Sequence, residues 1–134
     1  TRTARRPLKK NSMRIITSSI PDVLLLESTV HGDDRGYFME TWRNSVFEEQ
    51  GLDINFVQDN QSKSSRGTLR GLHYQEEPHA QSKLISVSKG KILDIAVDIR
   101  ENSKTYGKYF SYALSSESNK SCSRLSWFCT TASS

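Results

Sequence analysis

Residues 91–100 read KILDIAVDIR, and this stretch decides the fold because apolar and polar side chains alternate along it. Successive residues of a β-strand point to opposite sides, so the two sides of an extended chain differ in character here. One side carries Leu93, Ile95, Val97 and Ile99, and the other carries Asp94, Ala96 and Asp98. The alternation predicts a strand.

The residues on either side of this stretch predict further strands. Lys83–Ser88 is another strand-like run, and the intervening Lys89-Gly90 is typical of a turn. Residues 83–100 are therefore predicted to form a β-hairpin. Tyr106–Leu114 predicts the strand that follows it.

Earlier in the chain, the same patterns predict more short strands and one helix. The predicted strands involve Ile15–Ile20, Val23–Leu26, Tyr37–Trp42, a run beginning at Phe56, and Thr68–Gln75, with turns at residues 31–36 and 64–67. Pro21 separates the first pair, because proline cannot donate to a strand ladder. A capping box formed by Ser45 and Glu48, with Gly51 after the last turn, predicts a helix near residues 45–50.

Several short strands with glycine-containing turns, and no internal repeat, predict an all-β sandwich, barrel or jelly roll. The length of 134 residues fits one domain. No apolar run approaches the roughly 18–20 residues of a membrane span, which argues against a membrane partner. Two cysteines are too few for a disulfide-rich miniprotein.

The formal net charge of +4 comes from the two ends of the chain. Residues 1–12 carry five basic and no acidic side chains, whereas residues 13–120 have a net charge of −2. We therefore expect a disordered or non-native leader at 1–12, with an RNA-binding arm as an alternative, and no nucleic-acid partner for the domain at 13–120. Residues 121–134 form an atypical tail that holds Cys122 and Cys129, and a reducing cytoplasm is the expected location.

Polar side chains that could form a site concentrate in three segments, Asp34–Glu40, Gln58–Asn60 and Leu69–Gln75, with Lys83 following. A polar group inside a strand costs several kcal/mol unless it is satisfied, so a polar ligand would explain this concentration. The alternative is an ordinary solvated surface, with Arg35 or Glu40 in surface ion pairs and Lys83 at a solvated strand end. A metal cluster of His73, Glu77 and His79 is a further alternative. Without a metal, His73 is a credible general base, because an ordinary histidine pKa of about 6.5 lies near working pH.

Four stretches together carry a resemblance to a known family. They are IPDV (20–23), DDRGYFMETW (33–42), FVQDNQSKSSRGTLRGLHYQ (56–75) and DIAVDIR (94–100). Over residues 13–120 the chain resembles the dTDP-4-dehydrorhamnose 3,5-epimerases. The resemblance implies a metal-free, cupin-type antiparallel jelly-roll barrel, a homodimer, and no cofactor. Because the family continues beyond the position of Lys120, we expect an incomplete barrel.

The resemblance also implies roles for particular residues in the conversion of dTDP-4-dehydro-6-deoxy-D-glucose to dTDP-4-dehydro-L-rhamnose. His73 would be the general base, and Lys83 would steady the enolate oxygen and the sugar. Arg35 and Glu40 would contact the nucleotide-sugar, and Phe38 would pack against its base or sugar. The residues expected to line the substrate site and hold phosphate or sugar are Gln58, Asp59, Asn60 and Arg70.

The sequence departs from the family after Lys120. The family's AHGF-type histidine, its tyrosine general acid and the aspartate that orients the base have no match in residues 121–134. Without them a base should lose most of its catalytic advantage, which is roughly 10²–10⁴-fold. One interpretation is a shifted reading frame, since codons for Trp127–Thr130 read one base later can encode Gly-Phe-Ala followed by His or Gln. Alternatives to an active epimerase are an inactive remnant, a nucleotide-sugar binding module, or a sister dTDP-keto-sugar isomerase.

Overall fold

The computed structural model describes residues 12–118, 120–124 and 128–133, and beyond Lys120 it describes the backbone alone. Its ten strands and one helix are β1 (Met13–Thr17), β2 (Val23–Ser28), β3 (Val30–Asp33), β4 (Gly36–Met39), α1 (Asn44–Glu49), β5 (Leu69–His73), β6 (Lys83–Ile85), β7 (Lys91–Asp98), β8 (Tyr109–Ser115), β9 (Lys120–Arg124) and β10 (Phe128–Ser133). The predicted leader lies outside the described residues except for Ser12.

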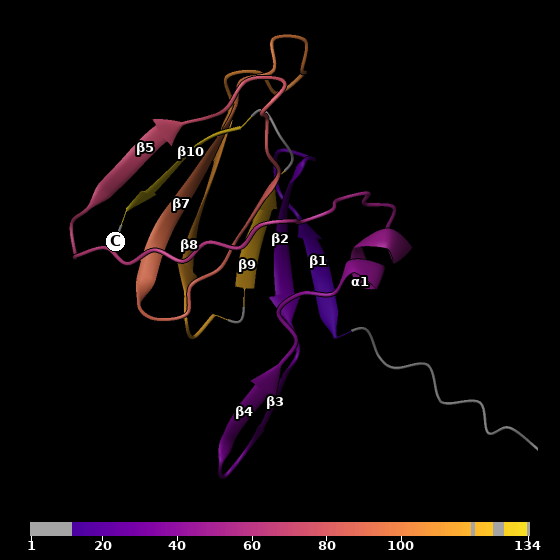
Figure 1. The fold of residues 1–134 in the computed structure, drawn as a ribbon, viewed down its shortest axis with the longest axis vertical. Coiled ribbons are helices and arrows are strands. Elements are labelled where there is room, and N and C mark those ends of the chain that lie inside the picture. Colours follow the sequence, from indigo (N-terminus) through magenta and orange to yellow (C-terminus); the bar gives the residue numbers. More distant parts are fainter. Residues whose placement is uncertain (1–11, 119, 125–127, 134) are drawn as a thin grey trace, which may run out of the picture.

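The strands form two four-stranded antiparallel sheets and a separate hairpin (Figure 1). Sheet 1 has the order β1-β2-β9-β6, and sheet 2 has the order β5-β10-β7-β8. The hairpin β3–β4 projects away from both sheets at the lower end of the view in Figure 1. The sheets do not close into a barrel, so the molecule is an open jelly roll.

The apolar run Val23–Leu26 explains how the layers pack. All four residues are buried, because β2 is covered on both faces. Val23 and Leu25 join the cluster between the two sheets, together with Ala96 of β7 and Leu114 of β8. Leu26 faces the other way and packs with Val46 and Phe47 of α1.

The all-β fold of cupin jelly-roll type is confirmed, as are the β1–β2 pair interrupted at Pro21 and the strands at β5 and β7. The turn glycines Gly67 and Gly90 have the expected positive φ, of 83° and 86°. No helix in the described part of the chain has the length and hydropathy to cross a bilayer.

The predicted hairpin over residues 83–100 is wrong. β6 pairs with β9 in sheet 1, whereas β7 pairs with β8 and β10 in sheet 2. The link at residues 86–90 therefore forms an arch from one sheet to the other. Alternation and a turn sequence are the same for a hairpin and for an arch, and pairing with strands distant in sequence decides between them.

Two other local predictions are also wrong. Helix α1 has Arg43 at its N-cap with no side-chain capping bond, so Ser45 does not form the predicted capping box. Instead, Asn44 Nδ2 donates to Glu48 Oε1 across one turn, at 2.6 Å. No strand begins at Phe56, because residues 52–65 run as an irregular connection.

The tail contains two strands, although its sequence shows no alternation of apolar and polar residues. β9 lies between β2 and β6, and β10 lies between β5 and β7. Both strands occupy inner positions among the described strands, so the tail adds one inner strand to each sheet.

Candidate functional site

The register of sheet 2 places His73 and Arg70 toward sheet 1. His73 is opposite Thr130, which is opposite Ala96, and Ala96 belongs to the cluster between the sheets. Residues directly opposite one another in neighbouring strands point to the same side of the sheet. In the next row, Arg70 connects through Ala132 to Asp94.

Sheet 1 brings Lys83 to the same space from the other side. Lys83 is opposite Arg124, which is opposite Val23, a buried residue of the cluster between the sheets. Ile85, two residues further along β6, packs against that cluster. Lys83 therefore faces the gap between the sheets and is half-buried there.

Three of the predicted site residues thus share one gap, although they come from the edges of two sheets. β5 is the outermost strand of sheet 2, which leaves His73 and Arg70 exposed. Arg70 Nε donates to Ser64 Oγ at 2.9 Å, which directs this side chain toward the connection that precedes β5. All five residues of β5 are exposed, so this edge of sheet 2 is accessible to solvent.

Gln58, Asp59 and Asn60 lie on the long connection between α1 and β5. All three are exposed, and Gln58 Nε2 donates to Asn60 Oδ1 at 3.3 Å. A connection that leads directly into β5 is well placed to supply polar groups beside that strand. That Gln58, Asp59 and Asn60 line the substrate site remains a prediction.

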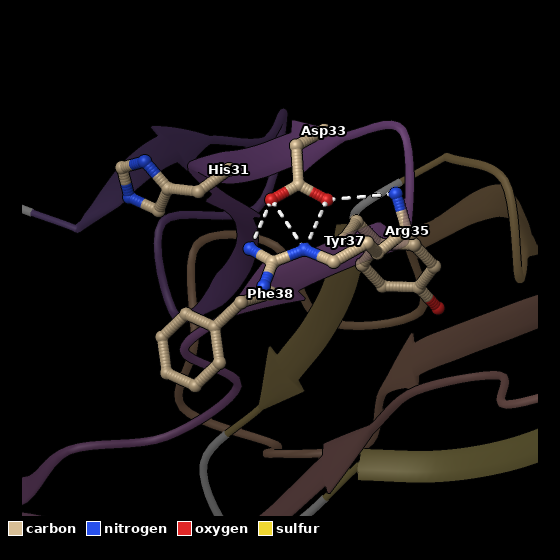
Figure 2. Close-up of a pocket in the computed structure, with 6 residues that line it drawn as sticks. His31, Asp33, Arg35, Tyr37 and Phe38 are labelled. Carbon is tan, nitrogen blue, oxygen red and sulfur yellow. Dashed lines mark hydrogen bonds and ion pairs between the residues drawn. The ribbon is translucent and has the colours of Figure 1, made fainter.

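Arg35 and Phe38 lie on the β3–β4 hairpin (Figure 2). They line an open hollow of about 310 Å³ together with His31, Asp33 and Tyr37. The guanidinium and backbone N–H of Arg35 donate to Asp33, which lowers the pKa of the Asp33 carboxyl and raises the pKa of Arg35. Phe38 is 72% exposed, so most of its surface is accessible to a ligand or to another protein surface.

Glu40 follows the hairpin and takes part in a polar cluster with Ser12 and Arg43. Arg43 Nε donates to Glu40 Oε1 at 2.8 Å, and Arg43 Nη2 donates to Ser12 Oγ at the same distance. Ser12 Oγ donates in turn to Glu40. Arg35 and Glu40 therefore each form an ion pair, Arg35 with Asp33 and Glu40 with Arg43, as the surface ion-pair alternative from the sequence predicted.

The structure therefore does not bring all the predicted site residues together within one chain. His73, Arg70 and Lys83 face the gap between the sheets, whereas Arg35 and Phe38 lie on the hairpin far from β5 (Figure 1). The alternative metal cluster of His73, Glu77 and His79 does not form. In the described part of the chain, no three metal-ligating side chains lie close enough together to hold a metal ion.

The sequence made Asp94 a candidate only for a polar group near the site and gave Tyr112 no role, and both residues face the same gap. Asp94 is opposite Tyr112 in the row that contains Arg70, and it is only 3% exposed. The signal for Asp94 was present in the alternation of residues 91–100. The side of β7 that carries its aspartates is the buried side, whereas Leu93 on the other side is 42% exposed.

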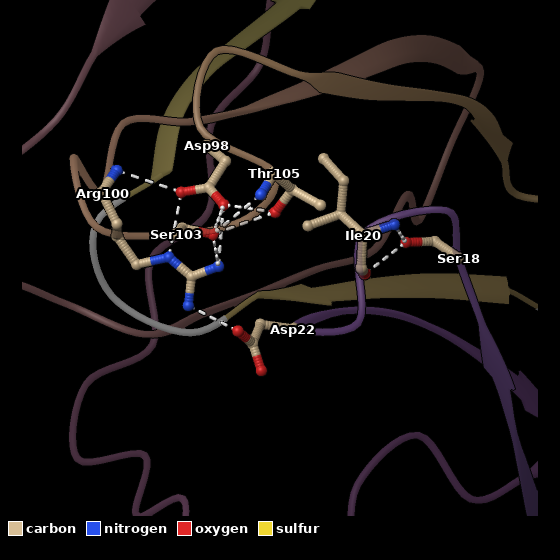
Figure 3. A network of polar contacts seen from close by, with 7 residues as sticks. All are labelled: Ser18, Ile20, Asp22, Asp98, Arg100, Ser103 and Thr105. Atoms are coloured by element: carbon tan, nitrogen blue, oxygen red, sulfur yellow. Dashed lines mark hydrogen bonds and ion pairs between the residues drawn. The ribbon is translucent and has the colours of Figure 1, made fainter.

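The second buried carboxylate, Asp98, is fully enclosed in a polar network (Figure 3). Arg100 donates to both of its oxygens, at 2.9 and 2.8 Å, and Ser103 and Thr105 donate hydroxyl bonds to Oδ2. The Arg100 guanidinium holds the pKa of Asp98 well below its usual range, and the carboxylate raises the pKa of Arg100. Arg100 also bonds Asp22 of the β1–β2 turn, so this network holds the two sheets together.

Comparison with known proteins gives consistent matches over this part of the chain. A model of the dTDP-4-dehydrorhamnose 3,5-epimerase family matches residues 17–123. A dTDP-4-dehydrorhamnose 3,5-epimerase of Shigella flexneri is 52% identical over 109 residues, which make up 81% of this chain and 60% of that protein. The chain thus spans about three-fifths of the length of this relative.

Solved structures resemble this fold closely. A dTDP-4-dehydrorhamnose 3,5-epimerase from Elizabethkingia anophelis NUHP1 matches with a TM-score of 0.86 and 44% identity, over 92% of this chain and 68% of that one. A dTDP-6-deoxy-D-glucose-3,5-epimerase from Legionella pneumophila Philadelphia 1, in complex with dTDP-4-keto-L-rhamnose, matches with a TM-score of 0.86 and 39% identity, over 90% of this chain and 64% of that one.

Proposed function

Because the chain belongs to the dTDP-4-dehydrorhamnose 3,5-epimerase family, we propose that its site removes protons next to the ketone of a dTDP-4-keto-6-deoxy sugar. The observation that carries this proposal is the register, which turns His73 of sheet 2 and Lys83 of sheet 1 toward one gap. With His73 on one wall of the gap and Lys83 on the other, a base and a cation could act on the same ketone and form its enolate.

The chemistry follows from the ketone at C4 of the sugar. The carbonyl acidifies the protons on both neighbouring carbons, C3 and C5. His73 removes one of these protons, and the electron pair of the C–H bond moves into an enolate whose charge rests on O4. Lys83 stabilises that oxygen as the charge develops. Solvent water then donates a proton to the opposite face of the carbon, which inverts it, and His73 releases the proton that it took to solvent.

The remaining predicted residues would bind the substrate rather than react with it. Arg70 lies in the row next to His73, and a planar guanidinium suits the diphosphate because it forms bidentate bonds. Gln58, Asp59 and Asn60 supply polar groups on the adjoining connection. No cofactor is needed for this proton transfer.

We further propose that the protein works as a homodimer in the cytoplasm. Arg35 and Phe38 lie on a hairpin that projects from the sandwich, so they could reach substrate in a second copy rather than in their own chain. Exposed apolar side chains on sheet 2, among them Leu93 and Tyr109, support an interface between copies.

Solvent deuterium exchange at C3 and C5 of dTDP-4-keto-6-deoxyglucose tests the proposal. The full chain should catalyse exchange, and His73→Ala should slow it at least about 10²-fold. The matched control is His79→Ala, since His79 lies in a turn outside the gap and its loss should leave the rate unchanged. Exchange that persists in His73→Ala would overturn the role of His73.

Binding and catalysis need separate measurement, because a nucleotide-sugar binding module is the alternative. Titration calorimetry with dTDP reports binding, and exchange reports the chemistry. Binding without exchange at any position would overturn the enzymatic proposal and favour the binding module.

A further inference from the structure

We propose that a pocket between the β3–β4 hairpin and the adjacent end of the sandwich binds a phosphate group, held by the ammonium of Lys120 and by surrounding hydroxyl groups. The pocket has a volume of about 210 Å³, and Tyr37 and Met39 of the hairpin form part of its wall. Six of the lining residues carry an aliphatic hydroxyl, namely Ser28, Thr41, Ser86, Ser88, Ser115 and Ser116.

The pocket is separate from the gap that His73 faces. Ser115, one of the lining residues, is opposite Lys91 at the start of β7. His73 connects through Thr130 to Ala96, which lies five residues further along β7. Five residues of an extended strand span about 17 Å, so a ligand in the pocket would be remote from the proposed base. This inference therefore does not depend on the proposed function.

The charge of the pocket wall favours an anion. Among the described residues that line the pocket, Lys120 alone is charged. Its ammonium donates to the Tyr112 hydroxyl at 3.0 Å and lies 3.8 Å from Glu27, which is outside the lining. The bond to Tyr112 raises the pKa of Lys120, so the side chain is a cation at neutral pH. An ammonium has three N–H donors, so it can keep both contacts and still donate to a ligand oxygen.

The hydroxyl groups supply further donors around this cation. No hydrogen bond joins any of the six aliphatic hydroxyls to another described residue. The loops that carry most of them are fixed relative to each other, because the backbone N–H of Ser116 donates to the carbonyl of Gly90 at 3.0 Å. The Ser118 hydroxyl donates to the carbonyl of Ser115 at 2.9 Å and braces the turn after β8. Donors held in place before the ligand arrives lose less entropy on binding.

The arrangement of these donors suits a phosphate. They come from the end of β2, the exit of the hairpin, the arch before β7 and the turn after β8, and the oxygens of a phosphate also point in several directions. A water molecule takes up about 30 Å³ of the liquid, so the pocket has room for phosphate with bound water or for a small phosphate ester. Half-buried Leu84 and Val87 would contact the organic part of such an ester.

Nuclear magnetic resonance of the full chain labelled with nitrogen-15 tests the proposal. Sodium phosphate replaces sodium chloride at constant ionic strength, so that general screening of charges does not change. The backbone amide signals of Ser86, Ser88, Ser115 and Ser116 should shift together and saturate. Shifts that grow without saturating, or that occur only around His73, would overturn the proposal.

A second titration with glucose 1-phosphate distinguishes the two sources of the phosphate group. Binding at least about tenfold tighter than that of inorganic phosphate would identify a phosphate ester as the ligand, through contacts of the sugar with the wall of the pocket. Equal or weaker binding would identify inorganic phosphate. Both outcomes require saturable shifts of the same four amide signals.

Lys120→Met should weaken phosphate binding at least about tenfold, because it removes the charge-assisted hydrogen bond. Lys104→Met is the matched control. It removes the same charge from an exposed lysine in the connection between β7 and β8, at the opposite end of these strands from the pocket. Equal weakening by both substitutions would mean a general effect of charge and would overturn the site.

A second variant keeps the test decisive, since Lys120 also bonds Tyr112 and its loss could disturb the fold. Ser86→Ala combined with Ser116→Ala removes two hydroxyls and no charge, and it keeps the backbone bond of residue 116. This double variant should also bind phosphate more weakly. The control is Ser111→Ala, which removes an exposed hydroxyl of β8 outside the pocket and should bind normally. Unchanged binding in the double variant would overturn the role of the hydroxyls.

Discussion

At the scale of single residues, Asp98 is the buried centre of a polar network that joins Arg100, Ser103 and Thr105. It is fully buried, and its two oxygens accept bonds from Arg100, Ser103 and Thr105. We predict that Asp98→Asn lowers the free energy of unfolding by about 3 kcal/mol, because Arg100 loses its buried counter-charge. Urea unfolding measures this, with the exposed Asp53→Asn as the control expected to change stability little. Equal midpoints for the two variants would contradict the prediction.

The same carboxylate predicts an acid sensitivity. The pKa of Asp98 is lowered in the folded protein, chiefly by its bonds from Arg100, whereas an unfolded aspartate titrates near about 3.9. Its stabilisation is therefore fully present above about pH 4 and is lost as the pH falls toward the folded pKa. Urea midpoints measured from pH 6 down to pH 2.5 should fall more steeply for the unaltered protein than for Asp98→Asn. Parallel curves would refute the assignment.

Residue types in the sequence predicted which side chains could do chemistry but not where each would point. The histidine in GLHYQ and the lysine in QSKL were assigned from resemblance, and the register turns both toward one gap. For the hairpin, the same reasoning could not foresee the separation of Arg35 from His73. That separation depends on how β3 and β4 leave the sheets, and no local pattern encodes it.

At the scale of elements, helix α1 is held by packing rather than by capping. Its Phe47 is fully buried, and its ring centroid lies 4.3 Å from that of Trp42 and 6.4 Å from that of Phe56. We predict that Phe47→Ala costs about 3–5 kcal/mol, the usual range for removing a buried aromatic ring. Urea unfolding followed by tryptophan fluorescence, to which Trp42 contributes beside Phe47, measures the loss.

Glu49→Ala is the matched control for this helix, since Glu49 is exposed on α1 and its loss should change stability by less than about 0.5 kcal/mol. A small effect of both substitutions would mean that α1 contributes little to the core of the molecule. A large effect of both would point to the intrinsic stability of the helix instead of its packing.

Several elements with a local signal were predicted well, although the capping box at Ser45 and the strand beginning at Phe56 were wrong. Gly51 does adopt a left-handed conformation after α1, with φ of 74°, as its place after the predicted helix required. The strands at β2, β5 and β7 also lie where their apolar patterns put them. Strands β9 and β10 have no such pattern, and they become strands through pairing with distant partners on both sides.

At the scale of the whole molecule, the outer face of sheet 2 presents apolar side chains to solvent. Leu93 of β7 is 42% exposed and Tyr109 of β8 is 66% exposed. We predict that the protein self-associates through this face, and that Tyr109→Lys weakens the association at least about tenfold by burying a charge in the interface. Sedimentation velocity over a range of concentrations measures the effect.

Thr17→Lys is the control for this prediction, because Thr17 is exposed on β1 at the edge of the other sheet. It should leave the association unchanged. A protein that sediments as a monomer at all concentrations would refute the interface, and equal weakening by both lysines would indicate a general effect of charge.

The inner positions of β9 and β10 have a consequence for how the protein is made. Val23 pairs with Arg124, and among the described strands β5 and β7 are joined only through β10, so neither sheet gains this inner strand until residues 120–133 have left the ribosome. We expect Val23 and Leu25, which pack against the other sheet, to stay uncovered until the later strands have emerged, and the emerging chain to depend on chaperones that shield such side chains. Pulse proteolysis of ribosome-stalled chains would detect this as protection that appears only after residue 133 has emerged.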